Sequence, residues 1–154
     1  MTPVSAALGG EILREYTPKM DQYRIPREAV RELIHFCRQY DWKQREARYL
    51  LSISSPDMSG MPKGNSVGRP VENAVIKRQK YLEDVDIIEK AARETDGGRW
   101  TAVLIESCCR QVPWHQLDQT QLPSSNRTDF FQARREFFWR LHEMKLGTLG
   151  AMDP

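Results

Sequence analysis

The chain has 154 residues, enough for one domain that buries a hydrophobic core. With 40% hydrophobic residues, 29% charged residues and no apolar run long enough to cross a bilayer, its composition excludes a membrane-spanning protein and is typical of a soluble one. The net charge of +2 gives no overall attraction for nucleic acid, so any basic surface must come from local clustering.

Residues 1–26 begin with small side chains and lack the basic start and continuous apolar stretch of a secretory signal. We therefore expect a flexible N-terminal tail and a cytoplasmic protein. The cysteines Cys37, Cys108 and Cys109 lack the CxxC spacing of a zinc site and suit small packing residues in a reducing compartment. Neither a redox pair nor a metal site is expected.

The segment from Arg27 to Ile53 predicts helix, because apolar residues recur at helical spacing and Pro26 suits a first turn. Near Asp41 two aromatic residues interrupt the apolar stripe, which leaves one long helix and two helices with a break as alternatives. Residues 53–70 are rich in Ser, Pro and Gly and have no periodicity, so a long loop is expected there.

A second long helix is predicted from about Val71 to Thr95, with apolar positions at helical spacing and charges between them. Asp96, Gly97 and Gly98 follow it and suit a C-terminal turn. Residues 27–98 are thus expected to form a helical scaffold that carries the loop 53–70.

Three shorter pieces are expected in residues 99–147, before a tail at 148–154. The first is a helix from Trp100 to Cys109, and the second is the stretch PWHQLDQ, which Pro113 opens. The third is a helix capped by Ser124, Ser125 or Asn126. Since no stretch alternates with a period of two, we predict an all-α protein: two long helices joined by a Gly/Pro loop, then a C-terminal helix-turn-helix.

The last helix of such a unit enters the DNA major groove. At 3.6 residues per turn, the apolar residues of this helix fall on one side: Phe130, Phe137, Phe138, Leu141 and Met144. Residues suited to base edges or phosphates lie at its start and on the other side: Asn126, Arg127, Thr128, Gln132, Arg135 and Trp139. The positive end of the helix adds to the attraction for phosphate.

A packing helix with solvated charges is the alternative to a DNA-reading helix. Arg134 does not fit a tidy division into two faces, because it falls within the apolar arc. Its charge has three available placements: extended outward past the core, in contact with DNA, or paired with an acidic residue. The sequence does not choose among them.

The order of these segments, together with the motifs GMPKGN and SSNRTDFFQARREFFWRL, resembles the phage and prophage transcriptional regulators of the RinA/ArpU type. The resemblance covers roughly residues 27 to 146 and implies a late-gene activator of a bacterial host, with a C-terminal part similar to the sigma-factor region that reads the −35 promoter element. It implies that Asn126, Arg127, Thr128, Gln132 and Arg135 face DNA while Phe130, Phe137 and Leu141 seat the helix. This chain departs from the family at Arg134, where a sigma-like helix usually carries an apolar residue.

The loop 53–70 is a second candidate DNA contact. Lys63 and Arg69 lie there among glycines and prolines, and Gly68-Arg69-Pro70 is similar to a minor-groove hook in which Arg enters a narrow groove. A plain flexible connector is the alternative.

Catalysis is not expected. The histidines His35, His115 and His142 have no metal-binding spacing, and the loop lacks the GK[ST] ending that cradles phosphate. The acidic residues of the second long helix (Glu83, Asp84, Asp86 and Glu89) suit a solvated or partner-facing surface. We predict neither an enzyme nor a cofactor.

The favoured function is therefore a sequence-specific DNA-binding transcriptional regulator, an activator by resemblance. Its expected partners are double-stranded DNA, bacterial RNA polymerase and a second copy of the chain. Tyr40, Trp42 and Tyr49 are candidate interface residues for this copy, although core packing is the default interpretation of such aromatics. Two alternatives stay open: a phage DNA-packaging protein of the small-terminase kind, and a helical interaction module without nucleic acid.

Overall fold

The computed structural model describes residues 17–54 and 68–148, and all regular secondary structure in these two ranges is helical. The predicted all-α class is confirmed for this part of the chain. The longer helices are α2 (Arg27–Arg38), α3 (Tyr40–Ser54), α4 (Gly68–Glu94) and α6 (Arg127–Leu146), and α5 (Thr101–Leu104) is a single turn. Short helical turns complete the set: η1 (Asp21–Tyr23), η3 (Thr95–Gly98), η4 (Ile105–Cys109), η5 (Trp114–Gln116) and η6 (Gln119–Gln121).

A break at Gln39 separates α2 from α3, so the second of the two sequence alternatives holds. Gln39 leaves the helical conformation with φ −89° and ψ 2°, and the next residue, Tyr40, donates a hydrogen bond of 2.5 Å to Glu89 of α4. Arg110 also bridges to α3, because its Nε lies 3.0 Å from the Asp41 carboxylate. These bonds turn α3 onto α4 at the break.

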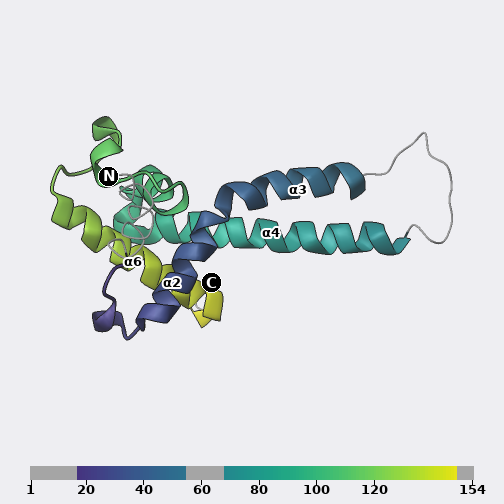
Figure 1. Cartoon of the computed structure of the whole chain (residues 1–154), viewed down its shortest axis with the longest axis horizontal. Coiled ribbons are helices and arrows are strands. Elements are labelled where there is room, and N and C mark those ends of the chain that lie inside the picture. Colours follow the sequence, from purple (N-terminus) through teal and green to yellow (C-terminus); the bar gives the residue numbers. More distant parts are fainter. Residues whose placement is uncertain (1–16, 55–67, 149–154) are drawn as a thin grey trace, which may run out of the picture.

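Helices α3 and α4 lie side by side and project from the rest of the molecule (Figure 1). We call α3 together with residues Gly68–Asp84 of α4 the arm. Its interior is thin: beyond Tyr40 at its base, the buried apolar residues are Ala47, Leu50 and Ala74. A buried ion pair fills the base of the arm, where Lys43 Nζ lies 2.8 Å from Asp84 Oδ2.

The remaining elements form a globular end made of α2, the second half of α4, α5 with η4, and α6 (Figure 1). Its core is continuous and contains large side chains that solvent does not reach, among them Leu33, Ile88, Trp100, Phe130, Phe137 and Leu141. Because apolar burial is the main favourable term in folding, this end holds most of the stabilising contacts.

The end of α4 agrees with the predicted turn. Asp96, Gly97 and Gly98 all have positive φ, and η3 closes the helix there. A Cβ atom on Gly98 would lie 2.9 Å from the carbonyl oxygen of Arg93, so this position requires glycine. The start of α4 is earlier than expected, since the helix begins at Gly68 and takes in part of the predicted loop 53–70.

The connection between the last helices differs from the expected tight breaks. The predicted helix from Trp100 to Cys109 is present as α5 followed by a π-turn, but the piece after Pro113 is only a three-residue 3₁₀ turn. Residues 110–126 separate the π-turn from α6, a longer stretch than the three- to four-residue turn of a helix-turn-helix. The extended backbone at Leu117 and Leu122 ends each of the short turns η5 and η6, so no longer helix forms here.

Candidate nucleic-acid interface

The start of α6 is fixed by a predicted cap. Asn126 accepts a hydrogen bond of 2.9 Å from the backbone N–H of Thr128 through its side-chain oxygen. The hydroxyl of Ser124 accepts from the backbone N–H of Asn126 at 3.0 Å and donates to the Asp129 carboxylate at 2.8 Å. Capping of this kind satisfies amide groups that a helix otherwise leaves unpaired, so the N-terminus of α6 has a defined position.

One side of α6 seats the helix on the core. All five residues of the predicted apolar stripe are buried: Phe130, Phe137, Phe138, Leu141 and Met144. The ring of Phe130 lies 6.0 Å from that of Trp100 and 5.2 Å from that of Trp114, centroid to centroid. The anchoring side expected from the sequence is therefore confirmed.

Most of the predicted DNA-facing residues are exposed on the other side of α6. The side chains of Asn126, Arg127, Thr128 and Gln132 face solvent, whereas Arg135 is half-buried. Trp139 is also half-buried and stacks on Tyr23, with ring centroids 5.7 Å apart. The prediction that Trp139 lies on an open reading surface is wrong, because its indole packs against η1.

The two candidate DNA contacts of the predicted loop 53–70 are Lys63 and Arg69. Lys63 lies outside the described residues. The backbone of Arg69 is in the first turn of α4 rather than in an extended loop, so the Gly68-Arg69-Pro70 segment does not have the conformation expected of a minor-groove hook.

Arg134 turns towards the protein. Its side chain is only 9% exposed, and its guanidinium carbon lies 4.9 Å from the ring centroid of Phe131. Arg127 approaches the same ring at 5.3 Å. Guanidinium groups over aromatic rings gain from cation–π attraction, which accounts for an arginine inside the apolar arc.

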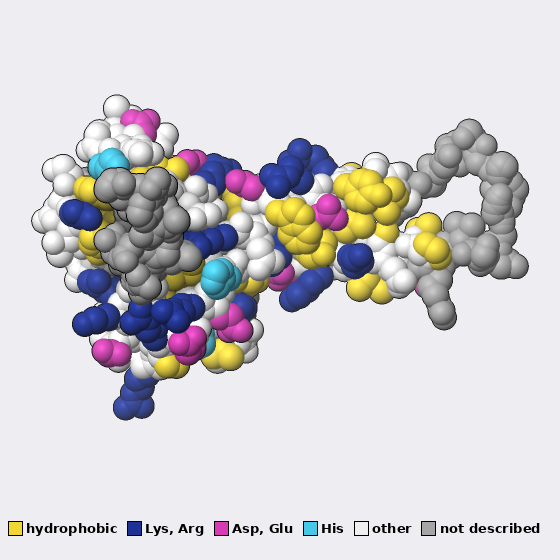
Figure 2. Space-filling model, in the orientation of Figure 1, with side chains coloured by type: hydrophobic (Ala, Val, Ile, Leu, Met, Phe, Trp, Pro, Cys, Tyr) yellow, Lys and Arg dark blue, Asp and Glu magenta, His cyan; other side chains and the backbone are white. Residues whose placement is uncertain are grey.

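The two flanks of α6 differ in charge. Arg127, Arg134 and Arg135 follow one flank, and Lys and Arg side chains gather over the α6 and α2 region of the globular end in Figure 2. The opposite flank borders a hollow whose lining includes three carboxylates (Asp96, Asp129 and Glu136) and one arginine, Arg99. Gln132 lines this hollow too. Two of these carboxylates are paired, Asp96 with Arg99 at 2.7 Å and Glu136 with Arg140 at 2.8 Å. An anion approaching α6 is therefore attracted more strongly to its Arg127 flank than to the other.

Other chemistry finds little support in the described ranges. They contain no group of three or more His, Cys, Asp or Glu residues arranged to hold a metal ion. The cysteines Cys37, Cys108 and Cys109 are buried and unbridged. Burial raises the pKa of the Cys37 thiol well above its usual value and that of Cys108 to about 12, so these two thiols stay neutral. None of the helices found there combines the length and apolar character needed to cross a membrane.

Comparison of the chain with protein-family models, curated proteins and solved structures found no match.

Proposed function

We propose that the chain is a sequence-specific DNA-binding protein that regulates phage or prophage transcription, and that it reads DNA with the first half of α6. The observation that supports this most is the division of α6 into a fully buried aromatic side and an exposed, capped, arginine-flanked start. The resemblance in sequence further suggests that the chain activates transcription and that RNA polymerase is a second partner.

The exposed groups at the start of α6 have separate roles in this proposal. Asn126 and Thr128 lie at the positive end of the helix, where a phosphate is stabilised by the helix dipole. Arg127 is held over Phe131 and needs little further ordering to contact a phosphate or a guanine edge. Gln132, one turn further on, suits an adenine edge.

The unequal charge of the two flanks of α6 sets the side from which DNA approaches the helix. The duplex backbone lies along the flank of Arg127 and Arg135, because the other flank carries Asp129 and two carboxylates, Asp96 and Glu136, that already pair with arginines. Trp139 takes no part in DNA contact in this arrangement and instead holds η1 against the helix.

A gel-shift and fluorescence-anisotropy titration against DNA from the genomic neighbourhood of the chain tests the proposal. We expect the Arg127→Ala/Arg135→Ala double variant to lose about 10- to 100-fold in affinity and to show a shallower dependence of affinity on salt. The matched control is Lys77→Ala/Arg93→Ala, which removes two exposed positive charges from α4. Equal loss in both variants, or no binding by the wild type, would reject the reading helix.

The arm favours a second activity, association with another helical protein surface. Large apolar side chains point outward on both of its helices: Trp42, Tyr49 and Ile53 on α3, and Val75, Ile76 and Leu82 on α4. Trp42 and Tyr49 are seven residues apart, as are Val75 and Leu82, which is the spacing of helices that pack in a coiled coil. Exposed apolar groups in such a pattern mark an interaction site.

We assign this surface to a second copy of the chain. Exposed Arg45 and Arg48 on α3 complement exposed Glu72 and Glu83 on α4 when two arms pack with α3 of one against α4 of the other. A dimer of this kind presents two α6 helices to two DNA half-sites. Sedimentation of the wild type should show a dimer and of Tyr49→Glu/Val75→Glu a monomer. A wild-type monomer would exclude the dimer, and a large ring would favour the packaging protein instead.

A further inference from the structure

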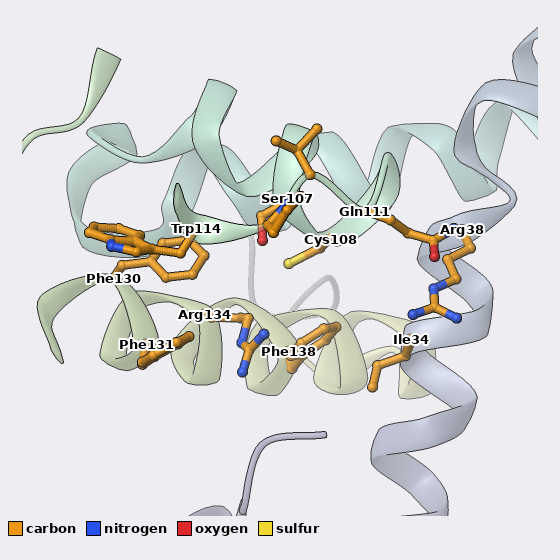
Figure 3. Close-up of a pocket in the computed structure, with 12 residues that line it drawn as sticks. Ile34, Arg38, Ser107, Cys108, Gln111, Trp114, Phe130, Phe131, Arg134 and Phe138 are labelled. Atoms are coloured by element: carbon orange, nitrogen blue, oxygen red, sulfur yellow. The ribbon is translucent and has the colours of Figure 1, made fainter. Parts of the chain in front are cut away.

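A cleft of about 140 Å³ lies between α2, α6 and the chain that follows the π-turn η4. Figure 3 shows its lining residues coming from these three elements, with Ile34 and Arg38 on α2, Phe131, Arg134 and Phe138 on α6, and Cys108 on the π-turn. The volume is close to the roughly 150 Å³ of an engineered apolar cavity that admits benzene. The cleft thus has room for one ring-sized group.

The walls of the cleft are mostly apolar. Four aromatic rings line it (Trp114, Phe130, Phe131 and Phe138), together with the aliphatic side chain of Ile34. Sites for small organic molecules have this composition: apolar and aromatic walls with a few polar groups that fix the orientation of the ligand.

The charged groups in the cleft are of one sign. Among the described residues that line it, Arg38 and Arg134 carry charge and no residue is acidic. Both guanidinium groups lower the pKa of the Cys108 thiol against the larger opposite effect of its burial. The Nε of Arg38 is buried and has no hydrogen-bond partner in the described structure. Two cations beside one apolar space are stabilised by an anion that enters it.

We propose that this cleft binds a small monocarboxylate with one aromatic or branched aliphatic group. The carboxylate lies against the guanidinium of Arg38, since a guanidinium fork matches carboxylate geometry, and the apolar group packs against the neighbouring side chains of Ile34 and Phe138 (Figure 3). The charge of Arg134, on the same wall of α6, adds to the attraction. A neutral amide of the same shape offers one weaker acceptor to the buried Nε of Arg38 and turns N–H donors towards a cation, so the site selects for charge as well as for size. This site borders the DNA-reading surface, since Phe131 lines the cleft and also carries Arg127 on its ring, but ligand binding there does not require DNA.

Benzoate and benzamide test the proposal, because they have nearly the same shape and differ in charge. Titration of the full chain by calorimetry and by amide NMR, with no DNA present, should show benzoate binding about tenfold more tightly than benzamide, with shifts confined to the cleft. Equal affinities, shifts elsewhere, no binding of benzoate at millimolar concentration, or binding of inorganic phosphate as tightly as benzoate would each overturn it.

Variants identify the responsible groups. Arg38→Gln should remove the preference for benzoate over benzamide, and the half-buried position of Arg38 allows this change without loss of the fold. Arg134→Met should do the same where it folds, since the methionine keeps the apolar part of the buried side chain. Arg135→Gln removes the neighbouring charge, which does not line the cleft, and should leave the preference intact. Retention of the preference in Arg38→Gln would contradict the site.

Discussion

The arm and the globular end bury opposite kinds of side chain. The globular end encloses Trp100, Phe130 and Phe137 completely. The arm encloses little beyond two alanines, one leucine and an ion pair, and it leaves Trp42 and Tyr49 facing solvent. A region built in the first way folds around its own core. A region built in the second way gains stability from a partner, so the comparison separates the part that holds the chain together from the part that meets another molecule.

Truncation of Phe137 gives the largest expected effect. Its ring is fully buried in the core of the globular end, so Phe137→Ala should lower the free energy of unfolding by about 3–5 kcal/mol. Chemical denaturation followed by circular dichroism measures the change. The matched control in the arm is Tyr49→Ala, whose exposed ring makes a loss below about 1 kcal/mol the expected result for the monomer. Equal losses for both would remove the distinction between the two regions.

The buried ion pair at the base of the arm should lose stability for an electrostatic reason, whereas Phe137 in the globular core loses apolar contacts. Lys43 is 5% and Asp84 is 7% exposed, so Asp84→Ala leaves a buried ammonium and should lower the free energy of unfolding by about 3 kcal/mol. Lys80, whose Nζ lies 3.3 Å from the same carboxylate, is exposed and adds little.

Replacement of both partners tests whether the pair itself stabilises the arm. The double variant Lys43→Met/Asp84→Leu should recover most of the loss, because apolar side chains of similar size replace a pair whose desolvation is costly. Denaturation curves of the single and double variants give the coupling directly. A double variant as unstable as Asp84→Ala would show that the pair is needed for more than charge balance.

Periodicity predicted the elements whose burial follows a simple stripe. The anchoring residues of α6, the end of α4 at Asp96 and the cap at Asn126 were all visible in the sequence, because each depends on local spacing or local backbone chemistry. The conformation of the connection before α6 could not be predicted from the sequence, because Pro113 suits the first turn of a long helix as well as a single 3₁₀ turn.

Contacts between segments that are distant in the sequence determine the positions of Trp139 and Arg134. Trp139 is half-buried only because Tyr23, far away in sequence, stacks on it. Arg134 was visible as an exception to the apolar arc, but its inward direction depends on Phe131 and on a cleft that α2 helps to form. No spacing rule contains either of these contacts, which are properties of the packed chain.

The cap of α6 connects the globular end to the proposed DNA surface. Asn126→Ala removes the bond to Thr128 N–H and should lower the free energy of unfolding by about 1 kcal/mol, while Asn126→Gly should cost only a few tenths. Thermal unfolding measures both. The buried aromatic side of α6 also holds the helix in place. In Asn126→Ala we therefore expect the free energy of DNA binding to weaken by more than the free energy of unfolding. A large loss of stability with unchanged affinity would separate this helix end from DNA binding.

The smallest expected effect depends on pH and lies at the end of α4. Asp96 accepts hydrogen bonds from Arg99 at 2.7 Å and from Trp100 Nε1 at 2.9 Å, and these bonds lower its pKa. A carboxyl whose pKa is lower in the folded chain stabilises it above its ordinary unfolded pKa of about 3.9, and the contribution disappears as the pH falls through the folded value. Since this carboxylate is 44% exposed, solvent screening limits the contribution to roughly 0.5 kcal/mol.

Asp96→Asn tests this contribution, because it removes the charge and keeps a residue that tolerates the positive φ of this turn. The stability difference between wild type and Asp96→Asn should therefore be present at pH 7 and shrink below pH 4, and a difference that is constant with pH would assign the effect to the backbone turn.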